Sequence, residues 1–248
     1  MKIDRLVKTG KNKYKVYFDN SEVTLFEDVI LNNDLLLKKD IDLELLDKVI
    51  EDNKYYEAYY LSLGYIDIKM RNKNEITKYL KKKDFSNKII DFTITKLTNL
   101  GLLNDNKYIE AFINDKINLS NDGPYKIKRL LLDIDYKEEV IDEYLNKIDS
   151  SIWKDKISHI ISKKTKSLKN NSYYMFINKM KSYLFDLGYE TELIELELSK
   201  VNYDNSSIEK EYKKASIKYK TDKNKIYNYL LRKGYGYDEI NSIINENE

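Results

Sequence analysis

The stretch IKRLLLDIDYKEEVIDEYL, residues 127–145, decides the fold of this 248-residue chain. Six of its apolar residues stand at offsets 0, 3, 4, 9, 14 and 18 from Ile127. Offsets 0, 3 and 4 place three side chains on one face of a helix, and offsets 14 and 18 do the same for a second helix. The stretch therefore predicts a pair of helices joined by a short turn.

The same six-position template occurs four times, with no insertion between its first and last positions. The copies are residues 76–94, 127–145, 180–198 and 226–244. Successive copies begin 51, 53 and 46 residues apart. Repetition of this kind is typical of arrays in which each unit buries its apolar face against its neighbours.

A turn with an aromatic residue joins the two helices of each copy. The aromatic residue stands at offset 9 and is Phe85, Tyr136, Tyr189 or Tyr235. In the first copy Phe85 precedes Ser86, a good N-cap residue, and Ile90 stands at the fourth helical position. This order predicts a hydrophobic staple between Phe85 and Ile90. The spacing predicts that the four aromatic residues belong to the core and are not platforms for stacking bases.

The residue before the aromatic closes the first helix of each pair. Gly188 and Gly234 suit the left-handed conformation that ends many helices. Asp84 and Asp135 hold the same position in the first two copies, where an aspartate tolerates that conformation less readily. Pro124, the one proline of the chain, stands just before the second copy and suits the first turn of a helix.

A further helix precedes each pair, at residues 55–65, 106–117, 152–164 and 207–219, so that each unit is a three-helix module. The first fifty residues differ, because short alternating stretches at 3–7, 13–18 and 22–26 are separated by polar turn residues and predict three strands. A helix at 42–53, or the first module, is expected to cover one face of this sheet.

We therefore expect a mainly α protein, built of tandem three-helix repeat modules that form an extended curved array behind a small N-terminal β-rich domain. A single proline and seven glycines agree with few breaks in helices. The expected division is a β-rich domain at 1–53 and modules at 54–101, 102–150, 151–201 and 202–248.

Composition narrows the class of protein further. A hydrophobic content of 42% with 35% charged residues predicts a folded chain. The absence of cysteine fits a reducing compartment, and neither a signal peptide nor an apolar stretch long enough to span a membrane is present in the sequence. We expect a cytoplasmic protein that does not enter a membrane.

Chemical motifs of catalysis are missing from the sequence. There is no glycine-rich phosphate loop, no metal-ligand spacing and no nucleophile with a base placed by motif. His159 is the one histidine, and it is expected to be structural or to face solvent. We expect no enzyme activity, no catalytic residue, no cofactor and no metal.

Three runs resemble the RecX family: RNKNEITKYLKKKDF at 71–85, LGLLNDNKYIEAFINDK at 100–116 and GPYKIKRLL at 123–131. The strand-rich start and the fourth module are similar to the long form of the family in low-GC Gram-positive bacteria. Asp84 and the run Asp133-Ile134-Asp135 depart from the glycine that family members usually have before the aromatic or aliphatic residue.

The resemblance implies a regulator of the RecA recombinase with a role in recombination, DNA repair and the SOS response. Such a protein binds in the groove of the RecA–DNA filament and lowers the ATPase, strand-exchange and co-protease activities of RecA. The expected partners are the RecA filament and, weakly and without sequence specificity, single-stranded or filament-bound DNA. A monomer is expected.

Basic residues that recur in or near the module helices are the candidate contacts with RecA or DNA, because the net charge of +2 gives the whole chain little attraction for phosphate. They are Arg71, Lys81, Lys82, Lys83, Lys126, Lys128, Arg129, Lys163, Lys164, Lys166, Arg232 and Lys233. The alternative is that these lysines form the solvated helix faces of a lysine-rich chain. Arginine is scarce in this sequence, and its planar guanidinium group pairs with anions in a bidentate manner, so a contact role for Arg71, Arg129 and Arg232 is less easily dismissed than one for the lysines.

Two other functions remain open at this point. The chain could be a sequence-independent DNA-binding protein that affects RecA only by competing for DNA. It could also be a helical-repeat scaffold that binds another protein. Binding to phosphate falls steeply as salt rises, whereas protein–protein contacts weaken less, so salt dependence separates the first two functions.

Overall fold

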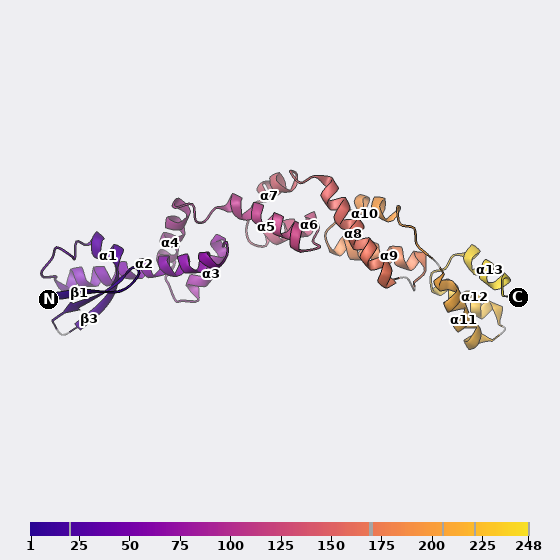
Figure 1. Ribbon diagram of the computed structural model, residues 1–248, viewed down its shortest axis with the longest axis horizontal. Helices are drawn as coiled ribbons and strands as arrows, with labels where there is room; N and C mark the ends of the chain where they lie inside the picture. Colours follow the sequence, from indigo (N-terminus) through magenta and orange to yellow (C-terminus); the bar gives the residue numbers. More distant parts are fainter. Residues whose placement is uncertain (20, 169–170, 205, 221, 248) are drawn as a thin grey trace. The chain divides into compact units, whose positions relative to one another are not determined.

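The structure is a computed structural model and describes residues 1–19, 21–168, 171–204, 206–220 and 222–247. The chain divides into two compact units, Met1–Tyr108 and Ile109–Glu248. Helices make up most of both units, and a three-stranded sheet lies in the first unit (Figure 1). The mainly α fold with a small N-terminal sheet is therefore confirmed.

The sheet consists of β1 (Ile3–Gly10), β2 (Lys13–Phe18) and β3 (Ser21–Phe26). The strands are antiparallel and lie in the order β1-β2-β3. Alternation along the strands buries Val16, Phe18 and Leu25 together on one face. The three predicted strands are confirmed, with β1 running on to Gly10. Asn20, one of the polar residues expected to separate the second and third strands, lies outside the described residues.

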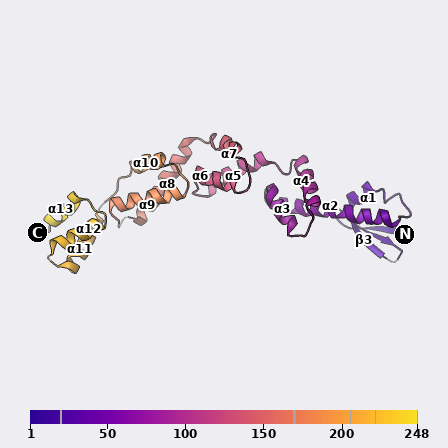
Figure 2. The same cartoon turned by 180° about the vertical axis from the view of Figure 1, so that it is seen from behind.

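Two helices cover the buried face of the sheet. Helix α1 (Glu27–Asn32) follows β3 directly and contributes Val29 and Ile30 to the core of the sheet, and α2 (Leu43–Ile68) contributes Val49. Both helices lie beside the strands in Figure 1 and in the reverse view of Figure 2. The sequence analysis missed α1, because a six-residue helix is too short to display a helical period.

Helix α2 is one continuous helix of 26 residues, whereas the sequence analysis predicted two helices at 42–53 and 55–65. That prediction was wrong, since no proline or glycine interrupts the chain near Lys54 and nothing else breaks the helical hydrogen bonds there. The Asp42 side chain caps the start by accepting a hydrogen bond from the Leu45 N–H at 2.7 Å. Val49 packs in the sheet core and Ala58 in the core of the first helix pair, so α2 joins the two.

The first helix pair consists of α3 (Lys73–Lys81) and α4 (Asn87–Asn99). A capping box between Asn72 and Glu75 starts α3. Ser86 is the N-cap residue of α4, but its side chain makes no capping hydrogen bond. Phe85 and Ile90 belong to the same apolar cluster, as the expected staple requires.

The second unit contains the other three helix pairs. Its helices are α5 (Asp105–Leu119, whose first turn belongs to the first unit), α6 (Pro124–Leu132), α7 (Glu138–Leu145), α8 (Ser150–Leu168), α9 (Tyr173–Asp186), α10 (Thr191–Leu198), α11 (Ser207–Tyr219), α12 (Lys223–Arg232) and α13 (Tyr237–Asn245). The predicted helix pairs and the first-turn position of Pro124 are confirmed. The boundaries of the five expected domains and the curvature of the array stay predictions.

The turns inside the helix pairs have the expected backbone conformation. Gly188 and Gly234 have φ values of 85° and 83°. Asp84 and Asp135 adopt the same left-handed region, with φ values of 64° and 67°. Short polar side chains tolerate this region better than other L-residues, which explains why aspartate can replace glycine here.

The start of α6 lies against the turn that follows α9, and the two meet backbone to backbone. The Gly123 N–H donates to the Leu187 carbonyl oxygen at 2.6 Å, and the Tyr125 N–H donates to the Gly188 carbonyl oxygen at 3.0 Å. A Cβ atom on Gly123 would lie 2.5 Å from the Gly188 oxygen, although φ at Gly123 is an ordinary −88°. Only glycine therefore allows this approach at position 123.

Replacing Gly123 with alanine is expected to destabilise the second unit by about 1–3 kcal/mol, because the methyl group must push two backbone segments apart. Gly64→Ala is the matched control, since Gly64 lies inside α2 with nothing within 4 Å of an added Cβ. That change should stabilise the protein by about 0.5–1 kcal/mol. Urea unfolding followed by circular dichroism measures both, and a Gly123→Ala protein as stable as the parent would contradict the close approach.

Candidate functional site

The last turn of α5 and the loop that follows it, residues 117–123 and together termed the junction loop, are held by side chains of α8 and of the turn after α9. The ammonium group of Lys156 on α8 donates to the carbonyl oxygens of Ile117 and Ser120. The Tyr189 hydroxyl, in the turn after α9, donates to the Asn121 carbonyl oxygen at 3.1 Å. The junction loop is therefore tied to α8 and to the turn after α9 at three of its carbonyl groups.

Asp122 is the buried charge of the junction loop. Its carboxylate lies 2.9 Å from the Lys116 ammonium and 2.8 Å from the Lys126 ammonium. Burial alone would raise the pKa of this carboxyl group, but the hydrogen bonds from Lys126 and Lys116 outweigh it and lower the pKa to about 2. The ion pairs join the end of α5 to the start of α6.

Burial also shifts the pKa values of the two side chains that hold the loop. It lowers the pKa of the Lys156 ammonium and raises the pKa of the Tyr189 hydroxyl well above its usual value. Tyr189 is almost fully buried and lies edge-on to Trp153, as expected for a core aromatic residue.

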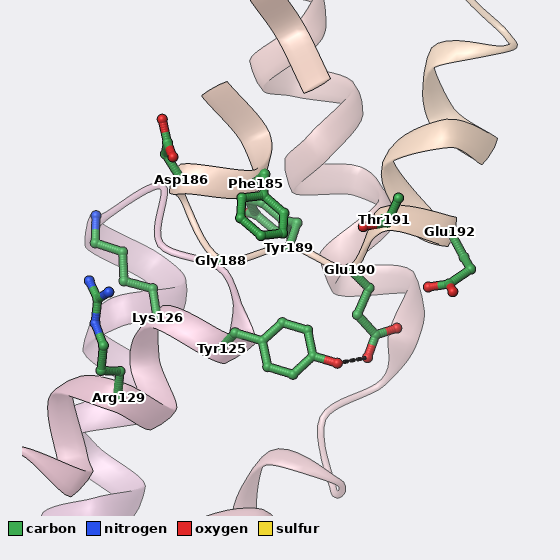
Figure 3. Close-up of a pocket in the computed structure, with 10 residues that line it drawn as sticks. All are labelled: Tyr125, Lys126, Arg129, Phe185, Asp186, Gly188, Tyr189, Glu190, Thr191 and Glu192. Atoms are coloured by element: carbon green, nitrogen blue, oxygen red, sulfur yellow. Dashed lines mark hydrogen bonds between the residues drawn. The ribbon is translucent and has the colours of Figure 1, made fainter. Parts of the chain in front are cut away.

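A groove of about 570 Å³ opens on the surface where α6 meets α9 and α10 (Figure 3). Tyr125 and Phe185 contribute exposed aromatic rings to it, and the Tyr125 hydroxyl donates to Glu190 at 3.1 Å. Lys126 and Arg129 lie on the other side of Tyr125 from Glu190 in this view. Asp186 lies on the same side as Lys126 in this view, so the groove has mixed charge at that end and is acidic at the other, where Glu190 and Glu192 lie.

Five of the twelve predicted basic residues are engaged within the protein. They are Arg71 (3.0 Å from Glu75 and 3.6 Å above the Tyr65 ring), Lys126 (paired with Asp122), Lys128 (2.7 Å from both Glu138 and Asp142), Lys164 (4.3 Å above the Tyr183 ring) and Lys233 (3.3 Å from Glu211). Their charges are partly neutralised or covered, which weakens any attraction for an outside anion.

The other seven predicted residues are exposed. They are Lys81, Lys82 and Lys83 at the end of α3, Arg129 on α6, Lys163 and Lys166 on α8, and Arg232 at the end of α12. Arg232 donates to the Asn228 carbonyl oxygen of its own helix at 3.2 Å. These residues do not hold equivalent positions in the modules. Lys163 and Lys166, for example, lie on α8 and not on the repeated pair α9–α10.

Several residues of the junction escaped the sequence analysis. Asp122 and Lys156 carry no periodic signal, since their partners lie in other helices or loops. Phe185 falls outside the six apolar positions of the template, and its exposure marks it as a surface residue of the groove. His159 is exposed on α8, which confirms the expectation that it is structural or faces solvent.

No helix among the described residues has the length and apolar character needed to cross a lipid bilayer. Within the same residues, histidine, aspartate and glutamate side chains nowhere gather in a group of three or more that could hold a metal ion.

The repeated helix pairs, the small sheet and the exposed cationic groups together define a helical-repeat protein with basic surface positions in both units. No family model matches the chain. A crystal structure of regulatory protein RecX has the same fold, with a TM-score of 0.69 at 20% identity, covering 81% of this chain and all of that one. A crystal structure of RecX from Lactobacillus salivarius gives a TM-score of 0.55 at 24% identity, over 59% of this chain and 95% of that one.

Curated relatives place the chain in a family. Regulatory protein RecX of Finegoldia magna is 30% identical over 240 residues, which cover 94% of this chain and 93% of the relative. Regulatory protein RecX of Streptococcus agalactiae serotype III is 31% identical over 260 residues and 99% of both chains. The chain belongs to the RecX family of regulatory proteins.

Asp122→Asn is expected to destabilise the second unit by about 2 kcal/mol at neutral pH, because the carboxyl pKa falls from 3.8 to about 2 on folding. A carboxyl group whose pKa is lowered by folding stabilises the folded state fully at pH values above its pKa in the unfolded chain. That stabilisation is lost as the pH falls toward the pKa of the folded protein. The difference in unfolding free energy between parent and variant should therefore shrink between about pH 4 and pH 2.

Urea unfolding across this pH range provides the measurement. Asp186→Asn is the control, because Asp186 is an exposed residue of the same unit and its change should cost less than about 0.5 kcal/mol. A difference between the parent and Asp122→Asn that stays constant down to pH 2 would contradict the ion pairs at the junction.

Proposed function

We propose that this chain regulates the RecA recombinase by binding in the groove of the RecA–DNA filament, and that it lowers the ATPase, strand-exchange and co-protease activities of RecA. The observation that carries the proposal is the relationship to curated regulatory proteins RecX over nearly the full length of both chains. The protein is proposed to act as a cytoplasmic monomer, without enzyme activity of its own.

The distribution of exposed cationic groups supports binding to a filament. Lys81, Lys82 and Lys83 lie in the first unit, and Arg129 and Lys163 lie in the second. A filament repeats its protomers and its phosphates along one direction, so it can meet both units at the same time. Several weak contacts that form together raise the overall affinity without any one strong contact.

The same cationic groups also favour the second candidate function, which is DNA binding that affects RecA only by competition. Exposed lysines attract phosphate regardless of base sequence. The two functions differ in stoichiometry, since a regulator bound to the filament acts long before the DNA is covered. A scaffold for another protein is the third candidate and predicts no effect on RecA.

The decisive experiment is the ATPase rate of cognate RecA on single-stranded DNA, with this protein added far below the amount that saturates the DNA. We expect inhibition at that low ratio. The test variant combines Lys81→Gln, Lys82→Gln and Lys83→Gln and removes three exposed positive charges. The helix pair should stay intact, because none of these side chains packs in its core. This variant should need a higher concentration for the same inhibition.

Inhibition that begins only as the DNA becomes covered would favour competition for DNA. An ATPase rate that does not change at any ratio would contradict both filament regulation and competition for DNA. The scaffold for another protein would then be the remaining candidate function.

A further inference from the structure

One side of α8 carries a row of basic residues. Lys156, His159, Lys163 and Lys166 are spaced by three, four and three positions, which places them along one face of the helix. At a rise of 1.5 Å per residue the row is about 15 Å long. We call this row the α8 stripe.

The α8 stripe borders a hollow of about 460 Å³ against the junction loop. Lys156, His159 and Lys163 line it from the helix. The junction loop contributes the amide side chains of Asn118 and Asn121, and also Ser120, whose hydroxyl group already donates to the Lys116 carbonyl oxygen at 2.9 Å. Asp155 is the one acidic residue among those that line this hollow within the described part of the chain, so positive charge is in excess there.

Hydrogen bonds hold the wall of the hollow that the junction loop forms. Lys156 donates to the Ile117 and Ser120 carbonyl oxygens, and Tyr189 donates to that of Asn121. These bonds fix the loop backbone against α8. An ammonium group has three donors, so Lys156 retains one N–H beyond the two bonds to the loop.

Lys163 and Lys166 differ from three lysines nearby that are engaged within the protein. Lys164 lies over the Tyr183 ring, and Lys116 and Lys126 share the Asp122 carboxylate. Lys163 and Lys166 are exposed, and neither makes an ion pair or a ring contact with another described residue.

We propose that the α8 stripe and the hollow beside it bind the phosphate backbone of a nucleic-acid strand. The inference rests on the proposed function, since it takes the DNA of the RecA filament as the strand that reaches this site. A length of about 15 Å corresponds to about four phosphates at the 3.4 Å axial rise of one strand in double-stranded DNA, and to fewer in a more extended strand.

The chemistry of the hollow favours phosphate over an acidic protein segment. Lysine and asparagine side chains, both present in the hollow, are among the groups that proteins use to contact phosphate and sugar oxygens without reading sequence. The donors follow a line along the helix, as the evenly spaced charges of a strand require. Leu119 is 83% exposed beside them and offers apolar contact to sugar or base.

Lys163→Gln combined with Lys166→Gln tests the site. Binding of the full chain to a fluorescent single-stranded oligo(dT) is measured over a range of salt concentrations. We expect the slope of log Kobs against log[salt] to fall in magnitude by about 1.4, since each lost phosphate contact on a single strand contributes about 0.7. At 0.1 M salt this corresponds to an affinity loss of about 25-fold if binding at 1 M salt is unchanged.

Lys147→Gln combined with Lys181→Gln is the control, because it removes the same charge from the same unit. Both lysines lie away from the hollow and pair with Glu143 and Glu195. The slope should change by less than about 0.3 in this variant. Equal slope changes in the two double variants would overturn the proposal, because they would mean that only total charge matters.

His159 gives a second readout, because it is the one histidine of the chain and its ring Hε1 proton therefore contributes one NMR signal. Addition of oligo(dT) should shift that signal in the parent and in the control variant. The shift should be reduced in the variant that lacks Lys163 and Lys166. An unshifted His159 signal at saturating oligo(dT) would place the strand elsewhere and overturn the proposal.

The two proposals can fail separately. If the Lys163 and Lys166 variant keeps its affinity for oligo(dT) but loses inhibition of RecA, the α8 stripe binds a protein surface, which overturns this inference and leaves the proposed function. If oligo(dT) binding depends on the stripe while RecA is unaffected by the protein at any ratio, the phosphate site stands and the proposed function fails.

Discussion

The approach of the Gly123 backbone to the turn at Gly188 is the contact on which the described surfaces of the second unit depend. Two short hydrogen bonds, from the Gly123 and Tyr125 N–H groups, join the start of α6 to the end of α9. One apolar cluster, which runs from Ile109 to Leu198, continues through both helix pairs beneath this contact. Helices that would pack separately as two modules are therefore held as one body.

The groove beside Tyr125 and the hollow beside α8 both depend on this contact. Tyr125 and Arg129 are set on one wall of the groove because α6 begins at Gly123, and Phe185 faces them from the end of α9 (Figure 3). The junction loop that leads into α6 also forms one side of the hollow beside α8, where Lys156 fixes it. Binding surfaces assembled from two modules are expected in repeat proteins, where stability and recognition both arise at the interfaces.

The sequence predicted what depends on local periodicity and missed what depends on distant partners. Four copies of one apolar template predicted the helix pairs, and Gly188 was expected to be left-handed because that turn needs it. The continuity of α2 was missed because two apolar faces with different partners look like two helices. The contacts of Arg71 with the Tyr65 ring and the Glu75 carboxylate were also not predicted, because the sequence does not show which side chains lie beside a charged residue.

Amide hydrogen exchange at Gly123 and Tyr125 is the most direct measure of whether the junction holds the two helix pairs together. Both N–H groups donate to carbonyl oxygens of the turn after α9, so opening of the contact exposes them. We predict that they exchange as slowly as the core amides of α9, because only unfolding of the shared core releases them. Exchange at the rate of an open surface loop would mean that the modules separate freely and would contradict this account.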